Sequence, residues 1–190
     1  MVAAGSNKWL IRRHRGYYLV LSKPRYPQVP NYKGLYRRGP FPCSNEKDRF
    51  FSLWQRYVKY LEKTPGVTTE LSVGELQEFA KLATQQAGEQ FEVVYFSQSC
   101  KCQHEAEYYG IDVASDGGYS MVGENIFPNA KSHLYGLINQ YFRTRLNSNG
   151  LFDTVGDAVL LKGVLSDLNT LSPGCVEQED WRIIYVFRVL

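Results

Sequence analysis

The sequence predicts a single α+β domain, spanning residues 1–190, with a mostly antiparallel sheet and about four helices. A length of 190 residues is typical of one domain. Hydrophobic residues make up 44% of the chain and charged residues 22%, as in ordinary globular proteins. Strand-like and helix-like segments come in clusters rather than in strict alternation, which favours α+β over a doubly wound fold.

The N-terminal quarter combines two short predicted strands with a long loop. Residues 1–7 are small and polar, and we expect them to be frayed or disordered. Residues 9–12 and 17–22 have the composition of strands. Residues 24–42 contain five prolines among Tyr, Arg and Gly, so they can form neither a regular helix nor a central strand. We expect a long ordered loop there.

Two helices are predicted to follow. Apolar residues recur every three or four positions between residues 50 and 61, and Pro65 ends this helix. Ser72 and Glu75 form a capping-box pattern that begins the second helix, and Gly88 ends it.

The next segment predicts strands and a hairpin. Residues 91–96 and 108–113 are rich in β-branched and aromatic side chains. A turn signal at residues 115–118 precedes another strand-like run at residues 119–122. The runs on either side of this turn are expected to pair as a hairpin.

Two helices and a strand complete the chain. The third helix is predicted over residues 129–146. Its inward side chains are expected to be Leu134, Leu137, Ile138, Tyr141 and Phe142. The fourth helix is predicted from a cap at Asp153 to residue 171, and its largely apolar composition suggests a central position. The apolar residues behind that prediction are Val155, Val159, Leu160, Val164, Leu165 and Leu168. Residues 181–189 predict the last strand.

Charge is distributed unevenly along the chain. Residues 1–45 contain nine Lys or Arg and no acidic residue, whereas residues 67–126 contain two basic and ten acidic residues. The basic arm, interleaved with aromatic residues, is a candidate nucleic-acid-binding surface, since cations bind phosphates and rings stack on bases. The two regions could also neutralise each other within the fold.

The acidic stretch is the candidate surface for a protein partner, because carboxylates steer a basic partner and tyrosines supply anchors. The residues assigned to this surface are Glu105, Glu107, Tyr108, Asp112, Asp116, Tyr119 and Glu124. The alternative is that the carboxylates are simply solvated while Tyr109, Ile111 and Val113 face the core.

Cys100, Cys102 and His104 form the only pattern that suggests a metal or a thiol enzyme. They are spaced two apart, so an extended segment would point all three to one side, and all three are zinc-ligand types. Structural zinc sites usually contain two Cys pairs with longer spacing, so we expect no metal, no cofactor and no catalytic residue. No apolar run is long enough for a signal peptide or a membrane span, and we expect a cytoplasmic protein with free thiols.

The segment from Tyr109 to Ser120 (YGIDVASDGGYS) resembles a strand–turn–strand segment of bacterial immunity proteins from polymorphic or contact-dependent toxin systems. The resemblance covers 12 residues and includes no catalytic motif. It implies a cytosolic, non-enzymatic protein that binds and neutralises a cognate toxin. Nuclease toxins are basic, which agrees with the acidic, tyrosine-rich stretch.

Overall fold

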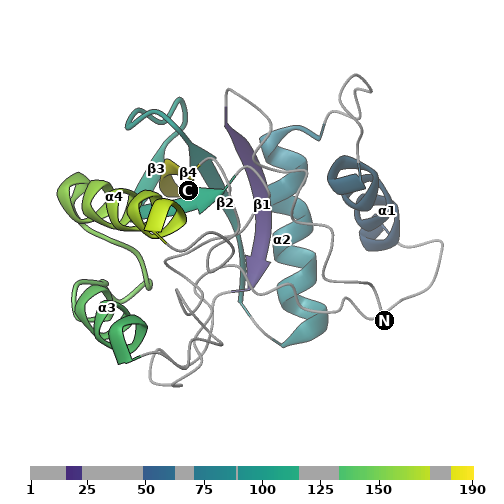
Figure 1. The fold of residues 1–190 in the computed structure, drawn as a ribbon. Helices are drawn as coiled ribbons and strands as arrows, with labels where there is room; N and C mark the ends of the chain where they lie inside the picture. The colour runs from purple at the N-terminus through teal and green to yellow at the C-terminus, as the bar shows by residue number, and fades with distance from the viewer. Residues whose placement is uncertain (1–15, 23–48, 63–70, 89, 116–132, 172–180) are drawn as a thin grey trace.

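The structure is a computed structural model, and it describes residues 16–22, 49–62, 71–88, 90–115, 133–171 and 181–190 (Figure 1). Several predicted features lie outside the described residues. They are the frayed segment 1–7, the strand 9–12, the loop 24–42 and the hairpin strand 119–122.

The α+β class is confirmed. The elements in chain order are β1 (Tyr17–Ser22), α1 (Arg49–Glu62), α2 (Val73–Ala87), β2 (Phe91–Ser97), β3 (Ala106–Ser115), α3 (His133–Arg143), α4 (Val155–Leu171) and β4 (Trp181–Val189). Among the described residues, no helix is long and apolar enough to cross a membrane.

The four strands form one antiparallel sheet in the order β1-β2-β4-β3. The C-terminal strand β4 therefore lies between β2 and β3. It pairs with β3 from Trp181 opposite Ser115 to Val189 opposite Ala106. The described partner of β3 is thus a strand some 70 residues later in the chain, while the predicted hairpin strand 119–122 lies outside the described residues.

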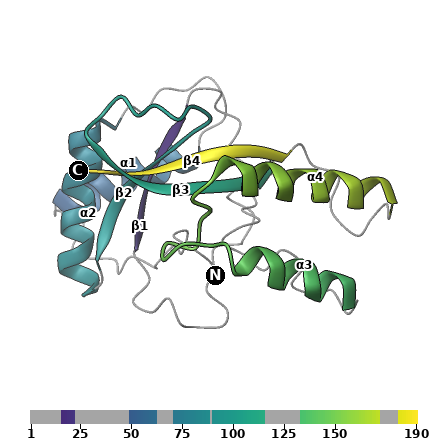
Figure 2. The same cartoon turned by 90° about the vertical axis from the view of Figure 1, so that its left-hand side faces the viewer.

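One face of the sheet is covered by helices at both ends. Side chains alternate between the faces along a strand, so the odd-numbered residues of β4 share one face. Trp181 packs in the cluster formed with α4, and Phe187 and Val189 pack in the cluster formed with α1 and α2. Tyr185 contacts both clusters. Figure 2 shows α2 and α4 near opposite ends of the long strands β3 and β4.

The other face carries a third apolar cluster. Apart from Leu151, its members come from the strands: Tyr17, Leu19, Leu21, Val94, Phe96, Tyr109, Ile184 and Val186. Tyr17 and Phe96 stack with ring centroids 4.9 Å apart across the β1–β2 pair.

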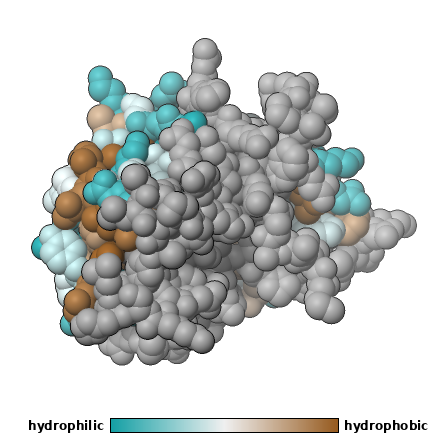
Figure 3. All heavy atoms as spheres, in the orientation of Figure 1, coloured by the Kyte–Doolittle hydropathy of each residue, from teal (hydrophilic) through white to brown (hydrophobic). Residues whose placement is uncertain are grey.

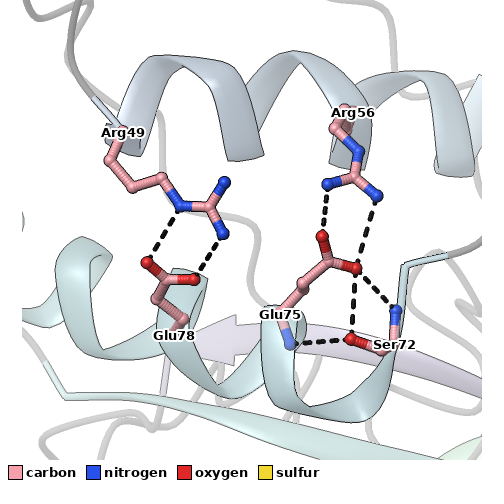
Figure 4. Close-up of polar contacts among 5 residues, drawn as sticks. All are labelled: Arg49, Arg56, Ser72, Glu75 and Glu78. Atoms are coloured by element: carbon pink, nitrogen blue, oxygen red, sulfur yellow. Dashed lines mark hydrogen bonds and ion pairs between the residues drawn. The ribbon is translucent and has the colours of Figure 1, made fainter.

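Helices α1 and α2 are joined by two ion pairs that bridge the space between them (Figure 4). Arg49 donates from Nε and an Nη atom to the two carboxylate oxygens of Glu78, at 3.0 and 2.7 Å. Arg56 also binds Glu75 in a bidentate manner, with its two Nη atoms donating to the two carboxylate oxygens. Glu75 also accepts a hydrogen bond from the backbone of Ser72, whose hydroxyl accepts one from the Glu75 backbone. The predicted capping box is confirmed, as is Gly88 as the left-handed residue that ends α2.

The burial of α3 and α4 differs from the prediction. Phe142 is buried as expected, but Leu137 and Tyr141 are 50% and 43% exposed, because the described contacts of α3 lie on one narrow side of the helix. Helix α4 is also only half covered. Its buried residues are Ala158, Leu161, Leu165 and Leu168, whereas Val155, Val159 and Leu160 are exposed.

The N-cap of α4 is Thr154 rather than the predicted Asp153. The hydroxyl of Thr154 accepts a hydrogen bond from the backbone of Asp157 at 3.2 Å and donates to its carboxylate at 2.7 Å. This places the start of the helix one residue later and leaves Asp153 available for another contact.

Candidate protein-binding surface

Three of the residues assigned to a protein partner are exposed at the start of β3 and just before it. Glu105 and Glu107 are exposed, and Tyr108 is 47% exposed. Asp112, further along the same strand, is only 2% exposed. A side chain with so little accessible area has no contact to offer a partner, so it is not part of this surface. Asp116, Tyr119 and Glu124 lie outside the described residues.

The pleat of β3 separates the exposed side chains. Glu107 and Tyr108 are neighbours in the strand and therefore point to opposite faces. The ring of Tyr108 lies against Phe187 of β4, with centroids 5.6 Å apart. A partner would thus reach both the carboxylate and the ring by approaching the outer edge of β3, rather than by covering one face of the sheet.

Tyr108 lies among polar groups from three other segments. Partial burial, followed by the charges of Tyr185, Asp153 and Cys100, raises the pKa of its phenol. These groups therefore lie within electrostatic range of the Tyr108 hydroxyl. Asp153 is exposed and adds a carboxylate that the sequence did not assign to this surface.

Asn147 holds Asp153 in place. Its amide nitrogen donates to the carboxylate of Asp153 at 2.7 Å and to the backbone carbonyl of Tyr109 at 2.9 Å. Its amide oxygen accepts from the backbone nitrogens of Asn149 and Leu151, at 2.9 and 3.2 Å. One side chain therefore fixes the 147–153 loop to the edge of β3.

The same loop pairs directly with β3 just after an irregularity in the strand. The β3–β4 register shifts between Tyr108 and Gly110, which leaves Tyr109 as an extra residue. Ile111 then exchanges two backbone hydrogen bonds with Phe152, at 2.8 and 2.9 Å. Gly110 has φ 141°, and a Cβ there would lie 2.7 Å from the Cβ of Leu151. Only glycine fits where the loop meets the strand.

A charged network on the sheet connects Glu107 to the interior. Arg188 of β4 binds the exposed Glu107 at 3.2 Å and the buried Glu92 of β2 at 3.4 Å. The hydroxyl of Tyr109 donates to the same carboxylate oxygen of Glu92 at 2.9 Å. Burial, followed by the charge of Glu92, raises the pKa of Tyr109, so this hydroxyl remains a proton donor.

Asp112 belongs to the interior on the same face. Burial, followed by the charge of Asp112, raises the pKa of Tyr17. Both side chains are under 10% exposed. Asp112 is therefore a buried polar residue of the sheet, at a position where the sequence suggested a contact residue.

Cys100, Cys102 and His104, the candidate zinc ligands, belong to the described residues. The described residues contain no group of three or more His, Cys, Asp or Glu side chains that could hold a metal ion. Cys102 is partly buried against the α1–α2 cluster, whereas Cys100 is exposed. The His104 ring lies edge-on to Tyr18 with centroids 5.7 Å apart. The zinc interpretation therefore has no support in this part of the chain.

A second exposed surface, which the sequence did not predict, lies on α3 and α4. It consists of five large apolar side chains that are each 43 to 53% exposed: Leu137, Tyr141, Val155, Val159 and Leu160. In Figure 3 hydrophobic atoms gather along this side of the molecule, over α4 and down towards α3. We call these five residues the α3–α4 apolar patch. Its signal in the sequence was a helix that is apolar all round.

Comparison of the chain with protein-family models, curated proteins and solved structures finds no match.

Proposed function

We propose that the protein is a non-enzymatic protein-binding module that recognises a basic protein partner at the first half of β3. One observation carries the proposal. A half-exposed tyrosine, Tyr108, lies at the edge of the sheet within electrostatic range of the exposed Asp153 and next along the chain to the exposed carboxylates Glu105 and Glu107. A tyrosine ring provides contact area with little loss of conformational entropy, and carboxylates at the rim accelerate association with a cationic partner.

The charge balance of this edge supports a basic partner. Arg188 is shared between Glu92 and Glu107, so these three residues carry one net negative charge. Glu105 and Asp153 add two more carboxylates nearby. The surface therefore repels an acidic partner and attracts a basic one.

The specific form that we propose is an immunity-type inhibitor that acts in the cytoplasm on a basic toxin domain. Its support is the resemblance of the segment from Tyr109 to Ser120 to such proteins, together with the acidic edge. Most of this segment, up to Ser115, is the second half of β3. It lies directly after the proposed contact residues, so an inhibitor of this kind would present its partner with the first half of the same strand that the resemblance identifies.

The experiment is affinity capture from the native cell extract at low and moderate salt, with mass spectrometry and a nucleic-acid assay on the eluate. We expect one stoichiometric basic protein with the wild type. The Glu105→Lys/Glu107→Lys variant should lose it, and Asp167→Lys, a reversal at an exposed site on α4, should retain it. Nucleic acid that dissociates at moderate salt, with no protein, would refute the proposal and favour the basic N-terminal arm instead.

A further inference from the structure

The α3–α4 apolar patch is distinct in chemistry from the acidic edge of β3. Exposed apolar side chains are normal when they are scattered, but a group of them on adjacent elements marks an interaction surface. Here five large ones belong to two consecutive helices, and Val159, near the middle of α4, is 53% exposed. In the part of the chain that the structure describes, each of these five side chains is about half exposed to water.

One pair of charges beside the patch is neutralised within the chain. Arg145 lies over the ring of Tyr141, 3.6 Å from its centroid, and binds the carboxylate of Asp157 at 3.1 Å. Its guanidinium also donates to the Tyr141 backbone carbonyl at 3.0 Å. This side of the patch therefore offers no net charge to steer a basic or an acidic partner. An occupant of this side must therefore be apolar and locally uncharged. A second copy of the chain meets this condition, because it presents the same surface.

The outward side of α4 contains glycines that the monomer does not require. Gly156, Val159 and Gly163 are all exposed and follow one line on the helix at spacings of three and four, opposite Leu161 and Leu165. Among the described residues, a Cβ at Gly163 would meet no atom within 4 Å, and at Gly156 it would meet only the hydroxyl of Thr154 at 3.8 Å. Neither glycine has a positive φ. Within the described part of the chain no contact requires glycine at either position, and Gly163, in the helix interior, weakens the helix.

Two pairs of positions on α4 are symmetric about its middle. About the midpoint between Val159 and Leu160, Gly156 matches Gly163 and Val155 matches Val164, while Asp157 lies opposite a residue of the other sign, Lys162. Two antiparallel helices related by a twofold axis place such positions opposite each other. The glycines of one copy would then meet those of the other and allow close approach, with Val159 packed against its own counterpart at the axis.

We propose that the protein forms a twofold homodimer in which the two α4 helices pack antiparallel through Gly156, Val159 and Gly163. Leu160 of each copy flanks the contact, and Leu137 and Tyr141 extend the apolar surface along α3. The aliphatic stem of Lys162, which is partly exposed, covers Val155 of the other copy while its ammonium group stays in water. This interface does not depend on the proposed partner-binding function, because it uses none of the residues at the edge of β3.

The test is sedimentation velocity of the full chain over a concentration series up to about 1 mM, a range that detects even weak self-association. We expect the dimer fraction of the wild type to rise with concentration. Val159→Glu and Val159→Lys should each be monomeric at the same concentrations, because each places like charges against each other at the axis. An equimolar mixture of the two variants should recover a one-to-one dimer. Matched controls are Gln85→Glu and Gln85→Lys, which change an exposed position on α2 and should dimerise like the wild type.

Three outcomes would overturn the proposal: a monomeric wild type throughout the series, wild-type dimerisation by the Val159 variants, or a mixture that stays monomeric. Circular dichroism identical to the wild type establishes that the variants fold, which we expect because Val159 is half exposed. The result is also separable from the proposed function. The Val159 variants retain the acidic edge and should capture the same partner, whereas Glu105→Lys/Glu107→Lys should lose the partner and still dimerise.

Discussion

The hydroxyl of Tyr57 on α1 accepts a hydrogen bond from the backbone nitrogen of Val20 on β1 at 2.8 Å and returns one to the Val20 carbonyl at 3.4 Å. One helical turn later, Tyr60 makes the same two contacts with Tyr18, at 3.2 and 3.1 Å. These backbone groups are on the side of β1 that faces away from β2, since alternate residues of an edge strand point outward. Two tyrosines thus satisfy a sheet edge that would otherwise be open to a further strand.

We expect Tyr57→Phe to lower the free energy of unfolding by about 1–3 kcal/mol, because it leaves the buried amide of Val20 without its partner. Tyr60→Phe should cost somewhat less, since the hydrogen bond that its hydroxyl accepts from the backbone is longer and its two contacts are only partly buried. Urea unfolding followed by circular dichroism measures both. Tyr141→Phe, at a half-exposed ring on α3, is the control and should change stability by less than about 0.5 kcal/mol. Equal stability of all three variants would refute the edge-capping role.

Gly110 and Gly163 should respond in opposite directions to replacement by alanine. At Gly110 the added Cβ would lie 2.7 Å from Leu151 and 2.8 Å from the Phe152 carbonyl, at φ 141°. We expect Gly110→Ala to lose about 3 kcal/mol or more of unfolding free energy. Gly163→Ala should gain up to about 1 kcal/mol, measured at a concentration where the chain is monomeric. A harmless Gly110→Ala would show that the loop does not dock tightly on β3.

Asn147→Ala should destabilise the protein by about 2–4 kcal/mol. The backbone nitrogens of Asn149 and Leu151 lose their acceptor, and the 147–153 loop loses its anchor on β3. Thermal unfolding of Asn147→Ala and of the neighbouring Ser148→Ala gives the comparison. Ser148 is exposed, and its variant should unfold within a degree or two of the wild type. If both variants matched the wild type, the position of Asp153 beside Tyr108 would need another explanation.

The ion pair between Glu75 and Arg56 predicts a pH dependence. Hydrogen bonds from Arg56, and then from Ser72, lower the pKa of Glu75 from 4.5 to about 2. A depressed carboxylate pKa stabilises the fold above the pKa of the unfolded state, and this contribution disappears as pH falls through the folded pKa. The difference in unfolding free energy between wild type and Glu75→Gln should therefore be constant above about pH 5 and shrink between about pH 4.5 and 2.

The same difference should also decrease at high salt, since the pair is partly exposed. Glu105→Gln, the same replacement at an exposed position just before β3, serves as the control and should differ little in stability from the wild type over this pH range. A difference for Glu75→Gln that does not change with pH would contradict the assignment of the low pKa.

The local elements were predictable from the sequence because their signals are local. Strand β1 occupies the predicted residues, α2 has the predicted capping box and terminal glycine, and β2 and β4 match their β-branched, aromatic runs. The strand order was not predictable, because the insertion of β4 between β2 and β3 depends on pairing between distant segments. The role of Asn147 was hidden for the same reason, since its contact with Tyr109 spans 38 residues.

Burial was harder to predict than secondary structure. The sequence places Val159 and Leu160 in a central helix because apolar residues occur on every side of α4, and periodicity cannot choose an inward side in such a helix. It places Asp112 on the surface because aspartates are rarely buried, yet the sheet encloses this residue near Tyr17. Of the candidate contact residues, Glu105, Glu107 and Tyr108 remain in the proposed surface.

The most direct test of the protein-binding proposal is the affinity of the purified captured partner for three forms of the protein, measured by isothermal titration calorimetry. We expect Glu105→Lys/Glu107→Lys to weaken binding about tenfold or more, because the reversal opposes a basic partner at the edge of β3. Asp167→Lys should bind like the wild type. Equal affinity of all three forms, with the double variant folded, would contradict the account and place the partner elsewhere on the molecule.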